Sequence, residues 1–204
     1  MHAAQLYHQM GGTIQCVACW NQTDHTTYAF RKEDGIDFDQ LVSITDRFGE
    51  IDKQKAQAMG LEVLPGDAWL EQNVDILVPA ALENQIRPDN VGRIHPKVRI
   101  IAEAANGPTN PDVDAELTGR EILVIPDILA NAGGVICSYF EQVQSNMNYF
   151  WSRDEVLSKL DTLMTSAYVD VLTFSRKNTL SARDSVYMLA VDRVARACLD
   201  RGLI

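Results

Sequence analysis

Residues 126–141, PDILANAGGVICSYFE, have side chains and spacing suited to binding a ligand. Asn131 offers a carboxamide that donates and accepts hydrogen bonds, and Ser138 offers a hydroxyl in the first turns of an expected helix. Gly133 and Gly134 stand at the predicted bend from strand to helix, where missing Cβ atoms permit positive φ and close approach of a ligand. Unpaired N–H groups at a helix start favour an anion. This segment predicts a ligand site, and an ordinary loop with a good cap is the alternative.

Small and amide side chains follow two other predicted strands. Ala80 and Ala81 come directly after a run that ends in Pro79, which leaves room for a flat or extended ligand against the backbone; tight strand–helix packing explains them equally well. Asn106 stands in a turn-prone sequence, where its amide could bind a carboxamide or its own backbone. Because they follow neighbouring strands, Asn106 and Asn131 are predicted to face one cleft.

Apolar runs of strand length alternate with helical or loop segments, and this alternation predicts an α/β fold with a doubly wound, parallel sheet. The predicted strands are 13–20, 75–79, 98–102, 122–125 and, more weakly, 61–64. The predicted helical stretches in the same part of the chain are 2–10, parts of 38–60, 111–118 and 135–151. Right-handed crossovers place the carboxyl ends of parallel strands along one edge, where ligands of such sheets bind. The polar clusters after 79, 102 and 125 are therefore expected at that edge.

Two long helices are predicted after residue 151. Ser152 and Glu155 have the spacing of a capping box, Ser181 begins the second helix in a similar way, and Gly202 is a natural stop. We therefore divide the chain into a nucleotide-binding part, 1–151, and a helical extension of the same domain, 152–204, whose apolar faces pack back on the sheet. Those faces comprise Val156, Leu160, Leu163, Met164, Ala167 and Val171 in the first helix, and Tyr187, Val191, Val194, Ala195 and Cys198 in the second.

Composition narrows the classes of function. A hydrophobic fraction of 46% with 23% charged residues is ordinary for a globular protein, and a net charge of -10 argues against nucleic acid or an anionic membrane as partner. No apolar run approaches a membrane span and no signal peptide is evident, so a cytoplasmic location is expected. Cys16 and Cys19 would point to opposite faces of a strand, and the histidines show no ligand spacing, so no metal site is predicted.

Three motifs, in this order, resemble the cofactor-binding domain of the Glu/Leu/Phe/Val dehydrogenases, and of the glutamate dehydrogenases among them. They are DILVPAALENQI at 75–86, AEAANGPT at 102–109, and PDILANAGGVICSYFE at 126–141. The resemblance runs from about residue 3 to 202. It implies a Rossmann-like, mostly parallel sheet and a homo-oligomer at full length. It also implies NAD- or NADP-dependent oxidative deamination of an L-amino acid to its 2-oxo acid and ammonia.

The resemblance also implies roles for individual residues. Ala80 and Ala81 would flank the cofactor, and Asn106 would contact its nicotinamide-ribose end. Asn131 and Gly134 would lie where the nicotinamide meets the α-carboxylate of the substrate. Val135 would be an apolar wall of the substrate pocket. Ser138 would bind the side-chain carboxylate, which favours L-glutamate over leucine, valine or phenylalanine.

The sequence departs from the family pattern at three places. No Gly-rich turn of the family's type is present, and the family's catalytic lysine and aspartate belong to an earlier domain, so an N-terminal truncation is expected and no catalytic residue is assigned here. Asn21 stands where an acidic residue usually binds the adenosine ribose, which leaves the choice between NAD and NADP open, and Ala104 replaces an expected glycine. The chain is therefore expected to be catalytic only together with that earlier domain. The alternative functions are a noncatalytic fragment that binds a nucleotide or a partner, and a dehydrogenase for leucine, valine or phenylalanine.

Overall fold

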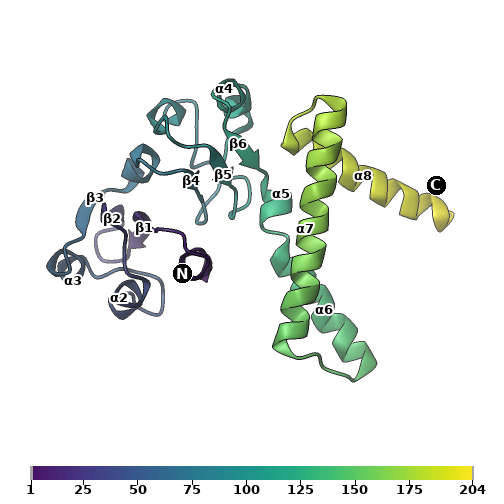
Figure 1. Cartoon of the computed structure of the whole chain (residues 1–204), viewed down its shortest axis with the longest axis horizontal. Helices are drawn as coiled ribbons and strands as arrows, with labels where there is room; N and C mark the ends of the chain where they lie inside the picture. Colours follow the sequence, from purple (N-terminus) through teal and green to yellow (C-terminus); the bar gives the residue numbers. More distant parts are fainter. Residues whose placement is uncertain (1, 204) are drawn as a thin grey trace. The chain divides into compact units, whose positions relative to one another are not determined.

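The chain divides into two compact units, and the computed structural model describes residues 2–203. Unit 1 comprises Met1–Asp75 and Gly92–Val98, and unit 2 comprises Ile76–Val91 and Arg99–Ile204. Helices and strands alternate in both units, which confirms the α/β class (Figure 1). The boundary expected after residue 151 falls inside unit 2 and stays a prediction.

Unit 1 contains a three-stranded antiparallel sheet in the order β1-β2-β3. The strands are β1 (Cys16–Asn21), β2 (Thr26–Arg31) and β3 (Glu62–Pro65), drawn in purple and blue in Figure 1. The expected parallel arrangement is wrong for this unit. A short turn, in which His25 has a positive φ of 53°, returns the chain directly from β1 into β2, and such a connection permits only antiparallel pairing.

The helices of unit 1 cover a small apolar core. They are α1 (His2–Gln9), α2 (Phe38–Ser43), α3 (Lys53–Ala58) and the 3₁₀ helix η1 (Gly66–Glu71). Asp37 and Asp52 cap α2 and α3 by accepting backbone N–H groups of the following turn. Phe30 of β2 and Leu41 of α2 are almost fully buried in the core.

Unit 2 contains the parallel sheet that the sequence predicts, in the order β4-β5-β6. Its strands are short: β4 (Ile76–Leu77), β5 (Ile100–Ala102) and β6 (Leu123–Ile125). The connections carry the 3₁₀ helices η2 (Val91–Arg93) and η3 (Pro111–Val113) and the helix α4 (Asp114–Gly119). Because all three strands run the same way, the polar segments that follow them share one edge of the sheet.

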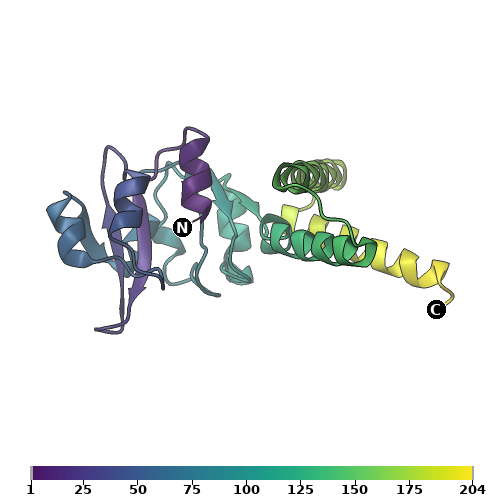
Figure 2. The same ribbon diagram turned by 90° about the horizontal axis from the view of Figure 1, so that it is seen from below.

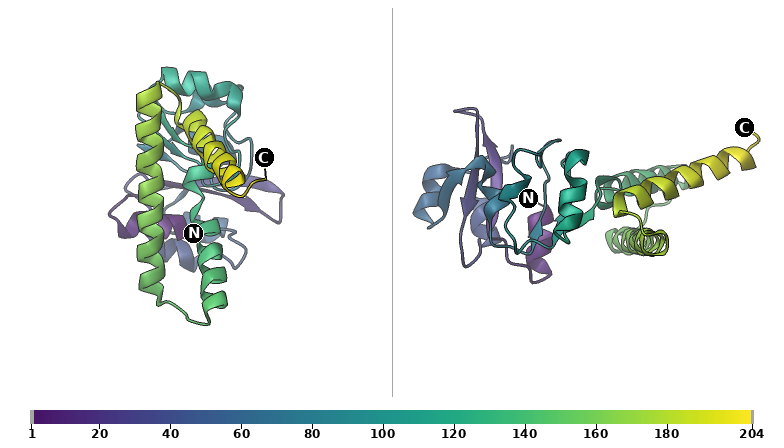
Figure 3. Two further views of the ribbon diagram at one scale, coloured as in Figure 1. Left: turned by 90° about the vertical axis from the view of Figure 1, so that its right-hand side faces the viewer. Right: turned by 90° about the horizontal axis from the view of Figure 1, so that it is seen from above.

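Four helices follow β6: α5 (Asp127–Ala130), α6 (Gly133–Met147), α7 (Arg153–Asn178) and α8 (Ala182–Asp200). Figures 1 and 3 show α7 lying beside α6 and crossing the first turns of α8. The capping box of Ser152 and Glu155 is confirmed, Ser181 caps α8, and Gly202 follows the end of α8 with φ of 65°.

The C-terminal helices pack on the rest of unit 2 over only part of their length. α8 contacts β6, and Val186 in its first turns is buried together with Val171 of α7 and Leu129 of α5. Farther along α8, Val191 and Val194 are each 65% exposed, so the apolar face expected to lie on the sheet is open there. Figures 2 and 3 show the C-terminal half of α8 extending beyond α6 and α7. Within residues 2–203, no helix combines the length and apolarity that crossing a membrane would require.

Candidate functional site

The predicted pair of amides forms at the carboxyl edge of the parallel sheet. Asn131 is the C-cap of α5, and its Nδ2 donates to Oδ1 of Asn106 over 2.8 Å. The same Nδ2 lies 3.5 Å from the carbonyl oxygen of Ala105. Among the described residues, Nδ2 of Asn106 donates to no group and Oδ1 of Asn131 accepts from none. The pair therefore offers one free donor and one free acceptor among the described residues.

The end of β4 is joined to the loop that carries Asn106. The carbonyl oxygen of Pro79 accepts the N–H groups of Ala104 and Ala105, over 3.1 and 3.0 Å. Ala80 and Ala81 follow this junction and are exposed, with only methyl groups beyond the backbone. The structure thus places both alanines after the strand next to the Asn106 loop, and their contact with a cofactor stays a prediction.

Gly134, Val135 and Ser138 all lie in the first turns of α6. No side chain caps this helix, and Ser138 donates its hydroxyl to the carbonyl oxygen of Gly134 over 3.2 Å. Val135 is 70% exposed. A Cβ built on Gly134 would meet no atom within 4 Å, so the surface there is open to a ligand.

The prediction that Gly133 and Gly134 allow a positive φ at the bend from strand to helix is wrong. Gly133 and Gly134 do not adopt positive φ, because α6 already begins at Gly133. The chain turns instead through α5 and its C-cap Asn131, which has φ of -100° and ψ of 3°. What the glycines supply is therefore the absence of side-chain bulk rather than an unusual backbone conformation.

Asn21 belongs to unit 1, whereas the other candidates belong to unit 2, and both polar atoms of its amide form hydrogen bonds. Its Oδ1 accepts the N–H groups of Thr23 and Asp24, and its Nδ2 donates to Oε1 of Glu50 over 2.5 Å. A second oxygen of Glu50 accepts the N–H of Gln22 over 3.0 Å. Asn21 is only 6% exposed, so the carboxylate of Glu50, rather than the amide of Asn21, is the more accessible group at the end of β1.

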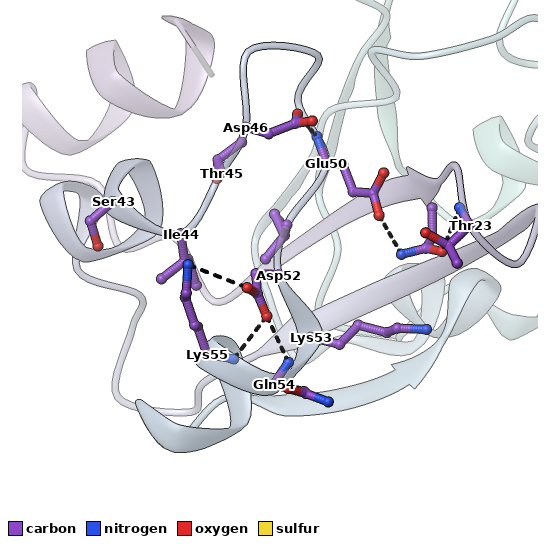
Figure 4. A pocket seen from close by; sticks show the side chains of 12 residues that line it. Thr23, Ser43, Ile44, Thr45, Asp46, Glu50, Asp52, Lys53, Gln54 and Lys55 are labelled. Carbon is purple, nitrogen blue, oxygen red and sulfur yellow. Dashed lines mark hydrogen bonds and ion pairs between the residues drawn. The ribbon is translucent and has the colours of Figure 1, made fainter.

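These residues border an open hollow of about 530 Å³ in unit 1 (Figure 4). Its charged lining comprises the carboxylates of Asp46, Glu50 and Asp52 and the ammonium groups of Lys53 and Lys55. Lys53 is paired with Asp24 over 2.6 Å and lies over the ring of Tyr28. Carboxylates therefore outnumber the lysines in the lining.

Sequence reasoning missed a buried cluster of charges in unit 2. Glu103, directly after β5, is fully buried, and Arg183 in the first turn of α8 donates to both of its carboxylate oxygens, over 2.7 and 3.1 Å. Arg183 also donates through Nε to Asp114 over 2.8 Å. Burial opposes the charge of Arg183, but the hydrogen bonds to Glu103 and Asp114 outweigh it and raise its pKa above the ordinary value. No spacing in the sequence signals a pair separated by 80 residues.

Cys16 and Cys19 lack the environment of reactive thiols. Burial raises the pKa of Cys16 to about 12 and also raises the pKa of Cys19, so both thiols stay protonated at neutral pH. Within residues 2–203, no group of three or more histidine, cysteine, aspartate or glutamate side chains is arranged to hold a metal ion.

Comparison with known proteins assigns this fold and these motifs to a class. A family model described as Glutamate/Leucine/Phenylalanine/Valine dehydrogenase matches residues 1–202. The chain therefore belongs to the Glu/Leu/Phe/Val dehydrogenase family, as the motifs in its sequence indicated.

Particular relatives are glutamate dehydrogenases. The chain is 43% identical over 170 residues to the glutamate dehydrogenase of Thermotoga maritima, and 40% identical over 174 residues to the NAD-specific glutamate dehydrogenase of Staphylococcus aureus. These matches cover 83% and 85% of this chain, but only 39% and 40% of the relatives. The chain thus spans about two fifths of the length of the curated relatives it matches.

Solved structures of glutamate dehydrogenases are also similar to this chain. The glutamate dehydrogenase of Peptoniphilus asaccharolyticus superposes with a TM-score of 0.77 and 33% identity, over 99% of this chain and 44% of that one. The hetero-hexameric glutamate dehydrogenase of Thermus thermophilus, in a Leu-bound form, gives a TM-score of 0.83 and 25% identity, over 97% and 44% of the two chains.

Proposed function

We propose that this chain is the nucleotide-binding part of an amino-acid dehydrogenase that deaminates L-glutamate to 2-oxoglutarate and ammonia with NAD or NADP. The observation that carries the proposal is the amide pair in unit 2. Nδ2 of Asn106 is a free donor and Oδ1 of Asn131 is a free acceptor, and the carboxamide of nicotinamide presents the complementary acceptor and donor. Membership of the family supports the same chemistry.

In this proposal the residues of the chain bind and orient the reactants. The cofactor, when bound, supplies the hydride acceptor for the substrate Cα. Asn106 and Asn131 fix the rotation of the carboxamide, and the methyl side chains of Ala80 and Ala81 leave the backbone accessible beside them. We assign proton transfer to no residue of this chain, since none of its lysines or aspartates matches the acid–base residues of the family.

The start of α6 is the proposed place for the substrate. Its uncapped N–H groups favour a carboxylate, and Gly134 leaves the approach open. Ser138 would exchange its bond to the carbonyl oxygen of Gly134 for one to the side-chain carboxylate of glutamate. Val135, which is exposed, would form the apolar wall of the pocket.

The charge around Asn21 favours NAD over NADP. In the hollow of unit 1, Lys53 is paired with Asp24 and Lys55 with Asp52. The additional phosphate of NADP would therefore meet the carboxylates of Glu50 and Asp46 there, and like charges at short range repel. The relative from Staphylococcus aureus is itself named NAD-specific.

Replacing carboxylates in the lining of the hollow by amides tests the proposed preference for NAD over NADP. In the natural protein at full length, Glu50→Gln combined with Asp46→Asn is expected to raise kcat/KM for NADP by several-fold and to change kcat/KM for NAD little. Glu62→Gln on β3, an exposed carboxylate outside the lining, is the matched control. An unchanged ratio of the two cofactors in the double variant would remove these carboxylates from the assignment.

Steady-state kinetics of the natural full-length protein test the reaction itself. We expect turnover of glutamate with NAD or NADP, and lower kcat/KM for leucine, valine and phenylalanine. If no amino acid is turned over, the dehydrogenase proposal fails and a noncatalytic fragment that binds a nucleotide or a partner takes its place. We also propose a homo-oligomer at full length. The Thermus thermophilus relative, described as hetero-hexameric, supports assembly into an oligomer, and the mass of the purified protein in solution tests whether one kind of subunit assembles alone.

A further inference from the structure

The fully buried carboxylate of Glu103 is the centre of a bonded chain that ends at the amide pair. A buried charge is costly unless it is paired and its oxygens are hydrogen-bonded. Glu103 meets both conditions: Oε1 accepts from Nη2 of Arg183, and Oε2 accepts from Nη1 of Arg183 and from the backbone N–H of Asp127, over 2.8 Å. One carboxylate therefore fixes both the start of α8 and the start of α5.

Asp127 carries the connection onward to the Asn106 loop. Its Oδ2 accepts the N–H of Gly107 over 2.8 Å, and its Oδ1 lies 3.9 Å from Nη1 of Arg183. Gly107, which has a positive φ of 53°, directly follows Asn106. At its other end the loop is held by the bonds from Ala104 and Ala105 to Pro79.

Both asparagines are thus tied to the same carboxylate by short paths. Asn106 is fixed through Gly107 and Asp127. Asn131 ends α5, whose first residue is Asp127, and the N–H of Asn131 donates to the carbonyl oxygen of Asp127 over 2.9 Å. A shift of Glu103 would therefore move both members of the amide pair, although Glu103 contacts neither of them.

We propose that Arg183 and Glu103 are positioning residues that hold Asn106 and Asn131 in the geometry that binds the nicotinamide carboxamide. The inference rests on the proposed function, because it assigns the amide pair to the cofactor. The planar guanidinium of Arg183 donates two hydrogen bonds to the carboxylate of Glu103, one from each Nη atom, while its Nε donates to Asp114. Lysine can replace the charge of Arg183 but not this two-pronged contact.

The test compares stability with cofactor binding in the natural full-length protein. The variants are Arg183→Lys, which keeps the charge, and Glu103→Gln, which keeps the shape. Calorimetry gives the Kd for NADH, kinetics give KM and kcat separately, and thermal unfolding gives stability. Arg193→Lys is the matched control, because Arg193 also lies in α8 but its pair with Asp170 of α7 is at an exposed site.

We expect Arg183→Lys and Glu103→Gln to raise the Kd for NADH by roughly 10–100-fold while the folded protein persists at the assay temperature. The KM for the cofactor should rise with it, and Arg193→Lys should change neither. If either variant unfolds, the double variant Arg183→Met with Glu103→Leu removes the fully buried carboxylate and its guanidinium partner together, which often preserves stability, and it too should bind NADH weakly.

Two outcomes overturn the inference in distinguishable ways. If the unaltered protein binds NADH and folded variants bind it equally well, Arg183 and Glu103 are structural only. If the unaltered protein does not bind NADH or NADPH, the proposed function fails and this inference fails with it.

Discussion

A side chain at position 134 is expected to hinder substrate binding without destabilising the fold. A Cβ at this position meets no protein atom within 4 Å, and alanine favours a helix more than glycine does. Gly134→Ala is therefore expected to keep or raise the free energy of unfolding, by up to about 1 kcal/mol. In the full-length protein the same change should raise the KM for glutamate, because the methyl group occupies the proposed substrate space.

Gly133→Ala is the control for this substitution. Its Cβ would lie 3.8 Å from Leu160 of α7, an ordinary packing distance on the protein side of the helix. Chemical denaturation and steady-state kinetics on both variants make the comparison. Equal KM values for the two variants would remove Gly134 from the substrate site.

Ser138 is expected to determine the preference for an acidic side chain. Ser138→Val replaces the hydroxyl by a methyl group and adds a second methyl, so the glutamate carboxylate loses a hydrogen bond while a leucine side chain loses none. The ratio of kcat/KM for glutamate to that for leucine should fall by roughly 10–200-fold, the range expected for one pocket contact. A ratio that stays the same assigns the selection to other residues.

At this scale the sequence predicts part of the candidate site. It places Asn106 and Asn131 at neighbouring strand ends, and the hydrogen bond between them confirms that they meet. It does not predict Arg183 with Glu103, because an ion pair between residues 80 apart leaves no local pattern. It likewise gives no sign that Glu50 lies against Asn21, since a turn between α2 and α3 brings that carboxylate to the end of β1. The binding roles of the predicted residues stay predictions.

Among the elements, α7 depends on a cap that can be tested directly. The hydroxyl of Ser152 accepts the N–H of Glu155 over 3.3 Å, and the carboxylate of Glu155 accepts the N–H of Ser152 over 2.7 Å. Ser152→Ala should lower the free energy of unfolding by about 1 kcal/mol. Urea denaturation followed by circular dichroism measures the difference, and Ser158→Ala, within the helix, is the control.

The same cap should depend on pH in a defined direction. The backbone N–H and the hydroxyl of Ser152 hold the pKa of Glu155 below its ordinary value of 4.5. A lowered folded pKa means that the contribution is complete above pH 4.5 and is lost as the pH falls through the folded pKa. Glu155→Gln should therefore be less stable than the unaltered protein at pH 7 and equally stable at the acid end, as denaturation curves at both pH values would show.

Local signals explain why some elements are predicted and others are not. Helix starts at Ser152 and Ser181 are set by neighbouring residues, so the sequence predicts them correctly. The sequence does not predict β2, because this strand is defined by its pairing with β1 and β3 rather than by a local pattern. β1 is close to β2 along the chain, and β3 is distant. Because the sequence does not predict β2, it predicts one parallel sheet, whereas the sheet of unit 1 is antiparallel.

At the scale of the whole molecule, the exposed face of α8 has a measurable consequence. Large exposed apolar groups such as Val191 and Val194 promote association. In the 204-residue chain, Val191→Lys with Val194→Lys should reduce binding of an apolar dye and concentration-dependent association, and should leave the free energy of unfolding unchanged. Dye fluorescence and light scattering check this.

A control is needed for the added charge, because the chain carries a net charge of -10. Thr162→Lys with Ser166→Lys places the same two charges on exposed polar positions of α7. If the control reduces association as much as the change on α8, the effect comes from net charge and the apolar face of α8 is not responsible.

The backbone N–H of Asp127, which donates to Glu103, allows motion at the carboxyl edge of the sheet to be measured by hydrogen exchange. An amide proton bound to a fully buried oxygen exchanges with solvent deuterium only when the surrounding structure opens. The exchange rate at Asp127 therefore reports how often its hydrogen bond to the buried carboxylate of Glu103 breaks. At Gly107, which binds a less buried carboxylate, exchange should be faster, and the difference between the two rates distinguishes fraying of the loop from opening of the buried pair.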